Sequence, residues 1–222
     1  MRPFTDLCLS PEKPLEVIKI AKTLGYNAVG LSQNEDLDEI DVINRLDLDP
    51  RNTNELNKSL RNSRWRNEII TVNCRNKSVA RQAGRDNRVD LITYPIVARW
   101  KENHLNHQQA RLMKDSGCGY LVNLSLLLVN DAYVLSKRIE FLKRNIYNAM
   151  KRDIPVVASS YAVDKYGLRD PYGLASLLSL LDVEEEKALD MVSSNPDMIV
   201  KRNREKLNKS YTMPGVWVIE EA

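Results

Sequence analysis

Metal-assisted phosphoester hydrolysis is the first chemistry to test against this sequence of 222 residues. A divalent ion in such a site needs about three protein ligands, drawn from histidine and carboxylate side chains on different strands. The chain has two histidines, His104 and His107, which lie in one short segment and could give one metal two ligands. Asp6 is a lone carboxylate in the first predicted strand, and we expect it to make a structural hydrogen bond. These residues do not build a metal site across several strands.

Nucleophilic catalysis is the second chemistry to consider. Ser159 and Ser160 follow a predicted strand, where a nucleophile could sit, but no Gly-x-Ser-x-Gly turn surrounds them. We expect their hydroxyls to cap backbone groups or to contact phosphate. Cys8, Cys74 and Cys118 are far apart and fall in or beside apolar segments, a pattern typical of buried free thiols rather than disulfides or a zinc site.

Basic charge is concentrated in the middle of the chain. Residues 61–152 hold eighteen Lys and Arg against seven Asp and Glu, whereas the net charge of the whole chain is +3. Residues 1–60 hold seven basic and eleven acidic groups, and residues 153–222 hold eight and twelve. Such segregation is typical of a surface that meets a polyanion, because neutralised phosphates release condensed counterions. The pattern indicates nucleic acid as a partner.

Four basic residues of the central segment recur at helical spacing. Lys77, Arg81, Arg85 and Arg88 follow one another at steps of four, four and three, so they share one face of the helix predicted over 78–87. We call these four residues the basic stripe. Unpaired like charges at this spacing repel one another, so the basic stripe favours an anion lying against it. The alternative interpretation is a solvated helix face.

Two further basic clusters each surround a tryptophan, one before and one after a pair of predicted strands. They are Arg61, Arg64 and Arg66 around Trp65, and Arg99 and Lys101 around Trp100. Arginine beside tryptophan suits phosphate contact combined with stacking on an unpaired base. Half-buried tryptophans among solvated charges are the alternative. The three basic groups lie in neighbouring parts of the chain, and we therefore hypothesise RNA or DNA binding there.

Alternating strands and helices must position these residues. Short apolar strands are predicted at 4–9, 28–31, 44–48, 69–74, 89–94, 120–124 and 155–158. Helices are predicted at 14–24, 54–62, 78–87, 106–115 and 131–152, and the remaining residues are predicted to be mostly helical. Continuously apolar strands joined by helical crossovers indicate a parallel sheet that is covered on both faces.

We therefore predict an α/β fold, a single irregular TIM-like β/α barrel with parallel strands over residues 1–222. An open doubly wound sheet is the alternative, because periodicity does not settle strand order. In either fold we expect the functional surface at the carboxyl ends of the strands. The sequence has no apolar run of about 18 residues, so it predicts no membrane span, and we expect a cytoplasmic protein.

Several short motifs, taken in order, resemble one known family. They are PVVASSYA at 155–162, LRDPYGL at 168–174, SNP at 194–196 and RNREKL at 202–207, after FTDL at 4–7 and LGY at 24–26. Their order and spacing resemble the thirty-kilodalton protein subunit family of archaeal and eukaryotic ribonuclease P. The resemblance covers nearly the whole chain.

The resemblance implies a barrel related to the polymerase and histidinol phosphatase class of metal phosphoesterases, with the metal ligands lost. It implies a noncatalytic RNA-binding subunit that binds no cofactor and supports the catalytic RNA, with its Mg²⁺, in removing 5′ leaders from precursor tRNA. The implied partners are ribonuclease P RNA, precursor tRNA, a small protein subunit in a heterotetramer of two plus two, and other ribonuclease P proteins.

The resemblance also singles out three basic residues. Arg169 falls in a Leu-Arg-x-Pro-like motif, and Arg202 and Lys206 fall in an Arg-Asn-x-x-Lys motif; such residues reach RNA or brace the fold. Two alternatives stay open from the sequence. One is a surviving metal-dependent phosphoesterase of the polymerase and histidinol phosphatase type, and the other is a general RNA-binding barrel outside ribonuclease P.

Overall fold

The computed structural model describes residues 2–32, 40–96, 103–208, 211–213 and 216–217. Seven strands form one sheet in chain order, and every pairing is parallel. The strands are β1 (Thr5–Asp6), β2 (Ala28–Leu31), β3 (Asp41–Leu48), β4 (Ile69–Asn73), β5 (Leu91–Thr93), β6 (Gly119–Asn123) and β7 (Val156–Ser159). A doubly wound sheet reverses its strand order near the middle, and this sheet does not. The predicted TIM-like α/β fold is therefore confirmed, as a nearly closed barrel.

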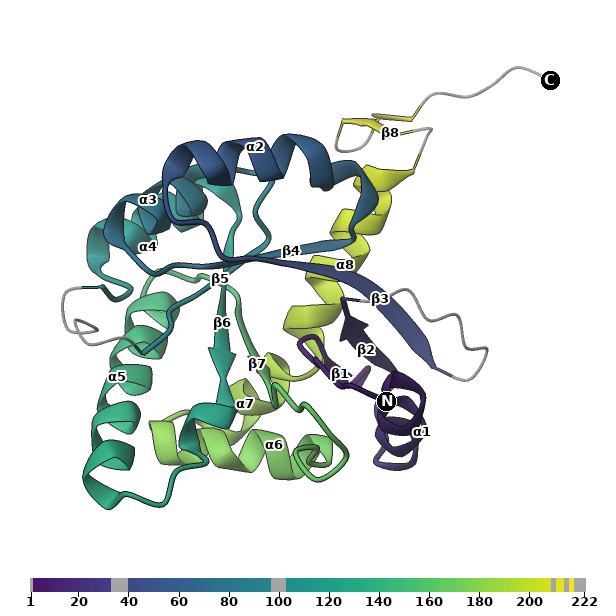
Figure 1. Ribbon diagram of the computed structural model, residues 1–222, viewed down its shortest axis with the longest axis vertical. Helices are drawn as coiled ribbons and strands as arrows, with labels where there is room; N and C mark the ends of the chain where they lie inside the picture. The colour runs from purple at the N-terminus through teal and green to yellow at the C-terminus, as the bar shows by residue number, and fades with distance from the viewer. Residues whose placement is uncertain (1, 33–39, 97–102, 209–210, 214–215, 218–222) are drawn as a thin grey trace.

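Helices surround the strands, as Figure 1 shows. They are α1 (Pro14–Thr23), α2 (Thr53–Ser63), α3 (Lys77–Arg85), α4 (His107–Ser116), α5 (Ala132–Met150), α6 (Pro171–Leu177), α7 (Glu185–Met191) and α8 (Ser194–Leu207). Three of them begin at an asparagine whose side chain accepts a hydrogen bond from the third helical backbone N–H: Asn52, Asn76 and Asn106. Among the helices of the described residues, none is both long and apolar enough to cross a membrane.

Two apolar cores explain why the strands read as continuously apolar. Side chains on one face of each strand pack against the outer helices, for example Ile70 and Val72 of β4. Side chains on the other face fill the barrel interior, where Ile69, Leu91 and Leu121 come from β4, β5 and β6. Helix α8 adds Ile199 and Val200 to this inner core. Successive strand residues point to opposite faces, so a sheet buried on both faces needs apolar residues at consecutive positions.

Strands β1 and β7 stand at the two edges of the sheet, and hydrogen bonds bridge the seam between them. At the carboxyl end, the Ser159 hydroxyl donates to the Asp6 carboxylate, and the Ser160 backbone N–H donates to Asp6 Oδ2 at 3.2 Å. The Cys8 backbone N–H donates to Ser159 Oγ at 3.1 Å. At the other end of β1, the Thr5 backbone N–H donates to the carbonyl of Val192, just after α7, at 2.9 Å. The predicted structural role of Asp6 and the predicted backbone-capping role of Ser159 are therefore confirmed.

One prediction of local structure is wrong. The helix expected over 78–87 ends at Arg85, because Asp86 has extended backbone angles, with φ at −95° and ψ at 114°. The end of the chain is mostly helical, as predicted, and it also contains β8 (Tyr211–Met213), which pairs antiparallel with β9 (Val216–Trp217).

Candidate nucleic-acid interface

The carboxyl end of the barrel, where the strands finish, is closed by a buried arginine. Arg45 of β3 donates through Nη1 to the Leu7 carbonyl at 2.9 Å and through Nη2 to Asp47 Oδ2 at 2.6 Å. Its side chain is fully buried. Gly30 permits this close packing, because a Cβ there would lie 2.0 Å from the Leu7 carbonyl oxygen. Arg45 therefore ties β1 to β3, and its positive charge is matched by Asp47.

A cavity of about 330 Å³ lies at the same end. Its polar lining comes from consecutive strands and the loop after β7: Asp47, Thr71, Asn73, Thr93, Asn123 and Tyr161. Tyr161 has a φ of 54°, in the left-handed region that is uncommon for residues other than glycine. The cavity offers amides and hydroxyls, and its one carboxylate is bonded to Arg45. We call it the mouth cavity.

The titratable side chains considered for catalysis, Asp6, Cys8 and His107, do not form one catalytic cluster among the described residues. Burial raises the pKa of Asp6, and burial also raises the pKa of the Cys8 thiol to about 12. His107 is the first residue of α4, and its ring contacts Arg152. Among the described residues, no three His, Cys, Asp or Glu side chains are grouped so that they could hold a metal ion. All three cysteines are free and buried, as the sequence predicts.

The amino end of the barrel, where the strands begin, is crossed by α8. Asn195 Nδ2 donates to the Val156 carbonyl at the start of β7, at 2.8 Å. Asn203 Nδ2 donates at 2.8 Å to the Glu68 carbonyl, just before β4. Arg204 forms an ion pair with Asp41 at the start of β3, at 2.7 Å. Helix α8 therefore covers this end and carries its own basic side chains to it.

A cluster of two arginines and one aspartate lies beneath α8. Asp90, just before β5, is 2% exposed and pairs with Arg64 at 2.5 Å and with Arg202 at 3.3 Å. Asp90 Oδ2 also accepts a hydrogen bond from the Ile70 backbone N–H at 2.8 Å. Arg202 Nη1 further donates to the carbonyl of Gly117 at 2.8 Å. We call Arg64, Asp90 and Arg202 the buried triad; it joins α8 to the segments before β4, β5 and β6 and leaves one positive charge in excess.

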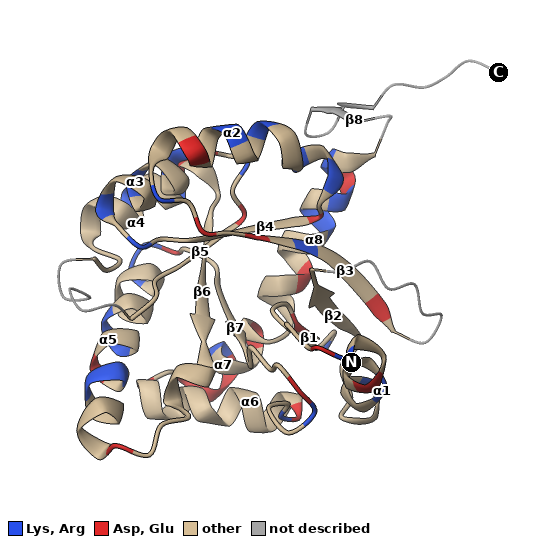
Figure 2. Cartoon of the chain, viewed as in Figure 1, with Lys and Arg blue, Asp and Glu red and all other residues tan. Residues whose placement is uncertain are grey.

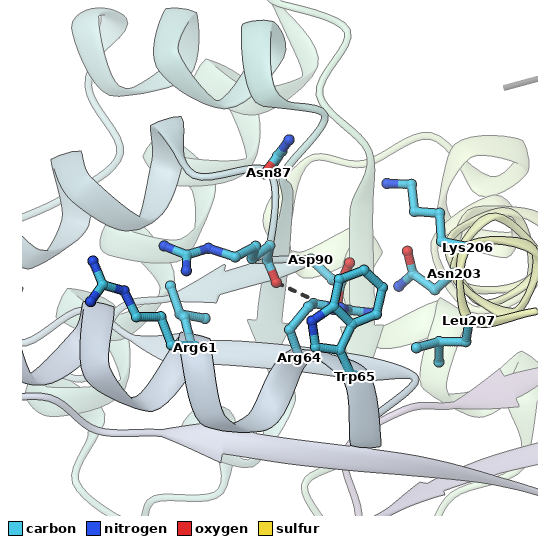
Figure 3. A pocket seen from close by; sticks show the side chains of 10 residues that line it. Arg61, Arg64, Trp65, Asn87, Asp90, Asn203, Lys206 and Leu207 are labelled. Atoms are coloured by element: carbon cyan, nitrogen blue, oxygen red, sulfur yellow. Dashed lines mark hydrogen bonds and ion pairs between the residues drawn. The ribbon is translucent and has the colours of Figure 1, made fainter. Parts of the chain in front are cut away.

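A pocket of about 530 Å³ lies above the buried triad. Its lining residues are Leu60, Arg61, Arg64, Trp65, Asn87, Arg88, Asp90, Asn203, Lys206 and Leu207. In Figure 3, Trp65 lies between Arg61 on α2 and Lys206 on α8. Trp65 is 77% exposed. Burial lowers the pKa of Lys206, and the nearby Arg202 and Arg64 charges lower it further, whereas Asp90 raises it. We call this cavity the amino-end pocket.

The basic stripe differs from its prediction at one end. Lys77, Arg81 and Arg85 are exposed on α3, whereas Arg88 lies beyond the end of that helix. Arg88 forms an ion pair with Asp86 at 2.7 Å, so it is not one of four unpaired charges. Arg81 donates to Gln108 at 3.0 Å. Figure 2 shows Lys and Arg positions, in blue, on α2, α3 and the C-terminal part of α8.

The other predicted RNA-binding residues occupy several places. Arg66 is exposed beside Trp65. Arg169 donates to the Tyr166 carbonyl at 2.7 Å and so holds its own loop together. Arg99 and Lys101 lie outside the described residues. The buried triad uses Arg64 and Arg202 as braces of the fold, and RNA binding by any of these residues stays a prediction.

Several of the basic residues lie away from the carboxyl ends of the strands, and the functional surface expected at those ends stays a prediction. Arg64, Arg202 and Lys206 lie at the amino end, because they precede β4 or belong to the helix that crosses that end. Sequence reasoning also missed Arg45 and Asp90. Each is a charged residue inside or beside an apolar strand, and such a residue needs a buried partner of opposite charge. That signal was present in the sequence, but it did not identify the partner.

Comparison with known proteins places this chain in a family. A family model described as RNase P subunit p30 matches residues 3–208. A protein from Methanosarcina mazei, "Ribonuclease P protein component 3", is 26% identical over 216 residues, which cover 92% of this chain and 89% of that protein. A relative of the same name from Methanococcus maripaludis strain C5 is 32% identical over 155 residues, which cover 70% of this chain and 65% of that protein.

The fold has a match among solved structures. A chain in the cryo-EM structure of archaeal ribonuclease P with mature tRNA superposes with a TM-score of 0.84 at 23% identity, over 97% of this chain and 98% of that chain. This likeness concerns the fold, and it agrees with the nearly closed barrel. The family match extends from Pro3 to Asn208, through every strand of the barrel and all eight α-helices. The chain therefore belongs to the RNase P subunit p30 family.

Proposed function

We propose that this chain is a noncatalytic, RNA-binding protein subunit of ribonuclease P. It supports the catalytic RNA in removing 5′ leaders from precursor tRNA. The excess positive charge at the amino end carries the proposal, because Arg61, Lys206 and the surplus charge of the buried triad gather around one pocket. The exposed part of the basic stripe extends this charge along α3. Neutralising phosphates on such a surface releases counterions and favours RNA binding without base-specific contacts.

The barrel's carboxyl end supports a noncatalytic role. In related architectures, catalytic groups sit at this end and converge on the substrate. Here, Asp6 is sealed in the seam by Ser159 and Ser160, and Asp47 is held by Arg45. These carboxylates serve the closure of the barrel. We infer that the Mg²⁺ needed for hydrolysis is held by the RNA and that this chain binds no cofactor of its own.

The partners follow from the same proposal. The relatives are named as protein components of ribonuclease P, and the archaeal complex contains mature tRNA. We infer that this chain contacts ribonuclease P RNA and precursor tRNA, and that it joins a small protein subunit in a heterotetramer of two plus two, together with other ribonuclease P proteins, in the cytoplasm.

An omission experiment tests the proposal. Ribonuclease P RNA and the other protein subunits are mixed with precursor tRNA and Mg²⁺, with and without this chain, and release of the 5′ leader is measured. We expect this chain to raise the cleavage rate and to release no leader on its own in Mg²⁺, Mn²⁺ or Zn²⁺. Metal-dependent cleavage by the chain alone, lost on Asp6→Ala but with the fold intact, would favour the phosphoesterase alternative.

A further inference from the structure

The amino-end pocket brings a tryptophan face and unpaired cations together at one rim. Trp65 belongs to the short 3-10 helix Arg64–Arg66, and its side chain is 77% exposed. Leu60 of α2 and Leu207 of α8 give the pocket an apolar part. A tryptophan left this exposed keeps its ring face available for stacking, and the indole ring is large enough to cover a nucleobase.

The basic side chains around Trp65 fall into two groups, those that form an ion pair with an aspartate and those that do not. Arg64 and Arg202 are committed to Asp90, and Arg88 is committed to Asp86. Arg61 is exposed near the end of α2, and Lys206 lies on α8 across the pocket, as Figure 3 shows. The carboxylate of Asp90 already accepts from Arg64, Arg202 and Ile70 N–H, so its single negative charge offsets the charge of Lys206 only in part. Arg61 and Lys206 are therefore the side chains that can meet a new anion.

We propose that this pocket holds one unpaired nucleotide of single-stranded RNA. The base stacks on Trp65, and the adjoining phosphates contact Arg61 and Lys206. Asn87, exposed at the rim, offers an amide to an edge of the base. The inference rests on the proposed function and deepens it, because it assigns one site and one kind of RNA contact.

Pocket size and shape favour an unpaired nucleotide over a duplex. The volume of about 530 Å³ lies within the range of roughly 300 to 1,000 Å³ that is usual for small-ligand sites. A base within a helix is already stacked on both faces and cannot reach a side chain ring, whereas a base in a loop or bulge can be splayed out. The anionic phosphate would also stabilise the protonated form of Lys206, which the neighbouring arginines oppose.

The first experiment compares Trp65→Leu with Trp65→Phe. The probes are a fluorescein-labelled adenosine hexanucleotide and an RNA duplex of the same length, and affinity is read by fluorescence anisotropy with the full chain. We expect Trp65→Leu to weaken hexanucleotide binding by roughly 5- to 150-fold, the usual effect of removing one stacked aromatic ring. Trp65→Phe should restore most of the affinity, and duplex binding should change by less than about twofold.

Matched controls separate stacking from general surface effects. Tyr166 is also 77% exposed but lies on a distant loop, so Tyr166→Leu should leave hexanucleotide binding unchanged. Arg61→Ala should reduce the slope of log affinity against log salt by about 0.7, the value for one phosphate contact on a single strand. Lys58→Ala, which removes an exposed charge one turn earlier on α2, should leave that slope unchanged.

Failure of the pocket and failure of the proposed function give different results. If the wild-type chain does not bind ribonuclease P RNA, the proposed function is wrong. If the wild type binds that RNA and Trp65→Leu binds it and the hexanucleotide equally well, the function stands and the nucleotide pocket is wrong. If Trp65→Leu instead loses binding to the small protein subunit while its RNA affinity is unchanged, the pocket is a protein interface. The proposal is also overturned if the wild-type chain shows no binding to the hexanucleotide up to millimolar concentration.

Discussion

The two ends of the barrel close in different ways. At the carboxyl end, Arg45 meets one aspartate, Asp47, and the charges balance. At the amino end, Asp90 meets two arginines, and Arg61 and Lys206 lie nearby with no carboxylate of their own among the described lining residues. Burying a charge is expensive unless it is paired, so each end needs its aspartate. The two ends differ in net charge: the charges beside the mouth cavity cancel, whereas positive charge is in excess at the amino end.

The excess positive charge therefore lies at a different end of the barrel from the one where this architecture usually carries its functional groups. Carboxyl ends of parallel strands are the usual place for function in this architecture. Here, α8 carries the Arg-Asn-x-x-Lys motif across the amino end, where its basic groups add to those that precede β4 and β5. In this chain the scaffold is that of a β/α barrel, whereas the excess positive charge gathers at the amino end.

The largest expected effect comes from the shared aspartate of the buried triad. Asp90→Ala leaves Arg64 largely buried without its partner, and we expect it to lower the free energy of unfolding by about 3 to 5 kcal/mol. Urea denaturation measures the change. Asp49 pairs with Arg75 at the surface, so Asp49→Ala is a matched control with an expected effect below about 1 kcal/mol. Equal effects of the two substitutions would show that the triad does not hold the amino end together.

The next effect belongs to the seam at the carboxyl end. Asp6→Ala removes the acceptor for the Ser159 hydroxyl and the Ser160 N–H, and should lower the free energy of unfolding by about 1 to 3 kcal/mol. Asp6→Asn keeps an acceptor for Ser160 and a polar group beside Ser159, so it should stay closer to the wild type. An Asp6→Ala protein as stable as the wild type would contradict this account of the seam.

The same residue predicts a pH dependence. Burial raises the pKa of Asp6 above its ordinary value of 3.8, so the folded protein holds this proton to a higher pH than the unfolded chain does. The stability from Asp6 is therefore complete below pH 3.8 and is lost as the pH rises through the folded-state pKa. Asn does not titrate, so the stability of Asp6→Asn relative to wild type should rise as the pH increases above 3.8. A difference that is constant with pH, or that falls, contradicts the prediction.

The smallest effect on stability is expected from the basic stripe. Reversing Arg81 and Arg85 to Glu should change the free energy of unfolding by less than about 0.5 kcal/mol, because both side chains are exposed. Affinity for ribonuclease P RNA should nevertheless fall, and the slope of log affinity against log salt should become flatter. Unchanged affinity at low salt with both residues reversed would mean that the stripe is only solvated.

The sequence predicted the architecture well because the fold is built from local patterns. The strands predicted at 28–31 and 69–74 and the helix at 106–115 agree with β2, β4 and α4 to within one residue at each end. The alternation of strands and helices left strand order open, and the structure shows the order β1 to β7 of a barrel. The strand predicted at 44–48 omitted the first three residues of β3, Asp41, Val42 and Ile43, which follow directly on an acidic stretch of the chain.

The candidate site was harder to predict, because charge spacing does not reveal partners. Arg81 and Arg88 looked alike in the sequence, but Arg88 lies beyond the helix and pairs with Asp86. Arg64 and Arg202 are 138 positions apart and meet only through Asp90. Trp65 was correctly associated with basic residues, but the contribution of α8 to the same pocket depends on how that helix crosses the barrel.

The most direct test of the central claim compares RNA binding at the two ends. Affinity of the full chain for ribonuclease P RNA is measured at several salt concentrations for Arg61→Ala with Lys206→Ala, and for Asn73→Ala with Thr93→Ala in the mouth cavity. We expect the amino-end pair to weaken binding and to reduce the slope of log affinity against log salt by about 1.4 to 1.8, and the mouth pair to match the wild type. The account would be contradicted if the amino-end double variant bound RNA as tightly as the wild type while the mouth-cavity double variant lost binding.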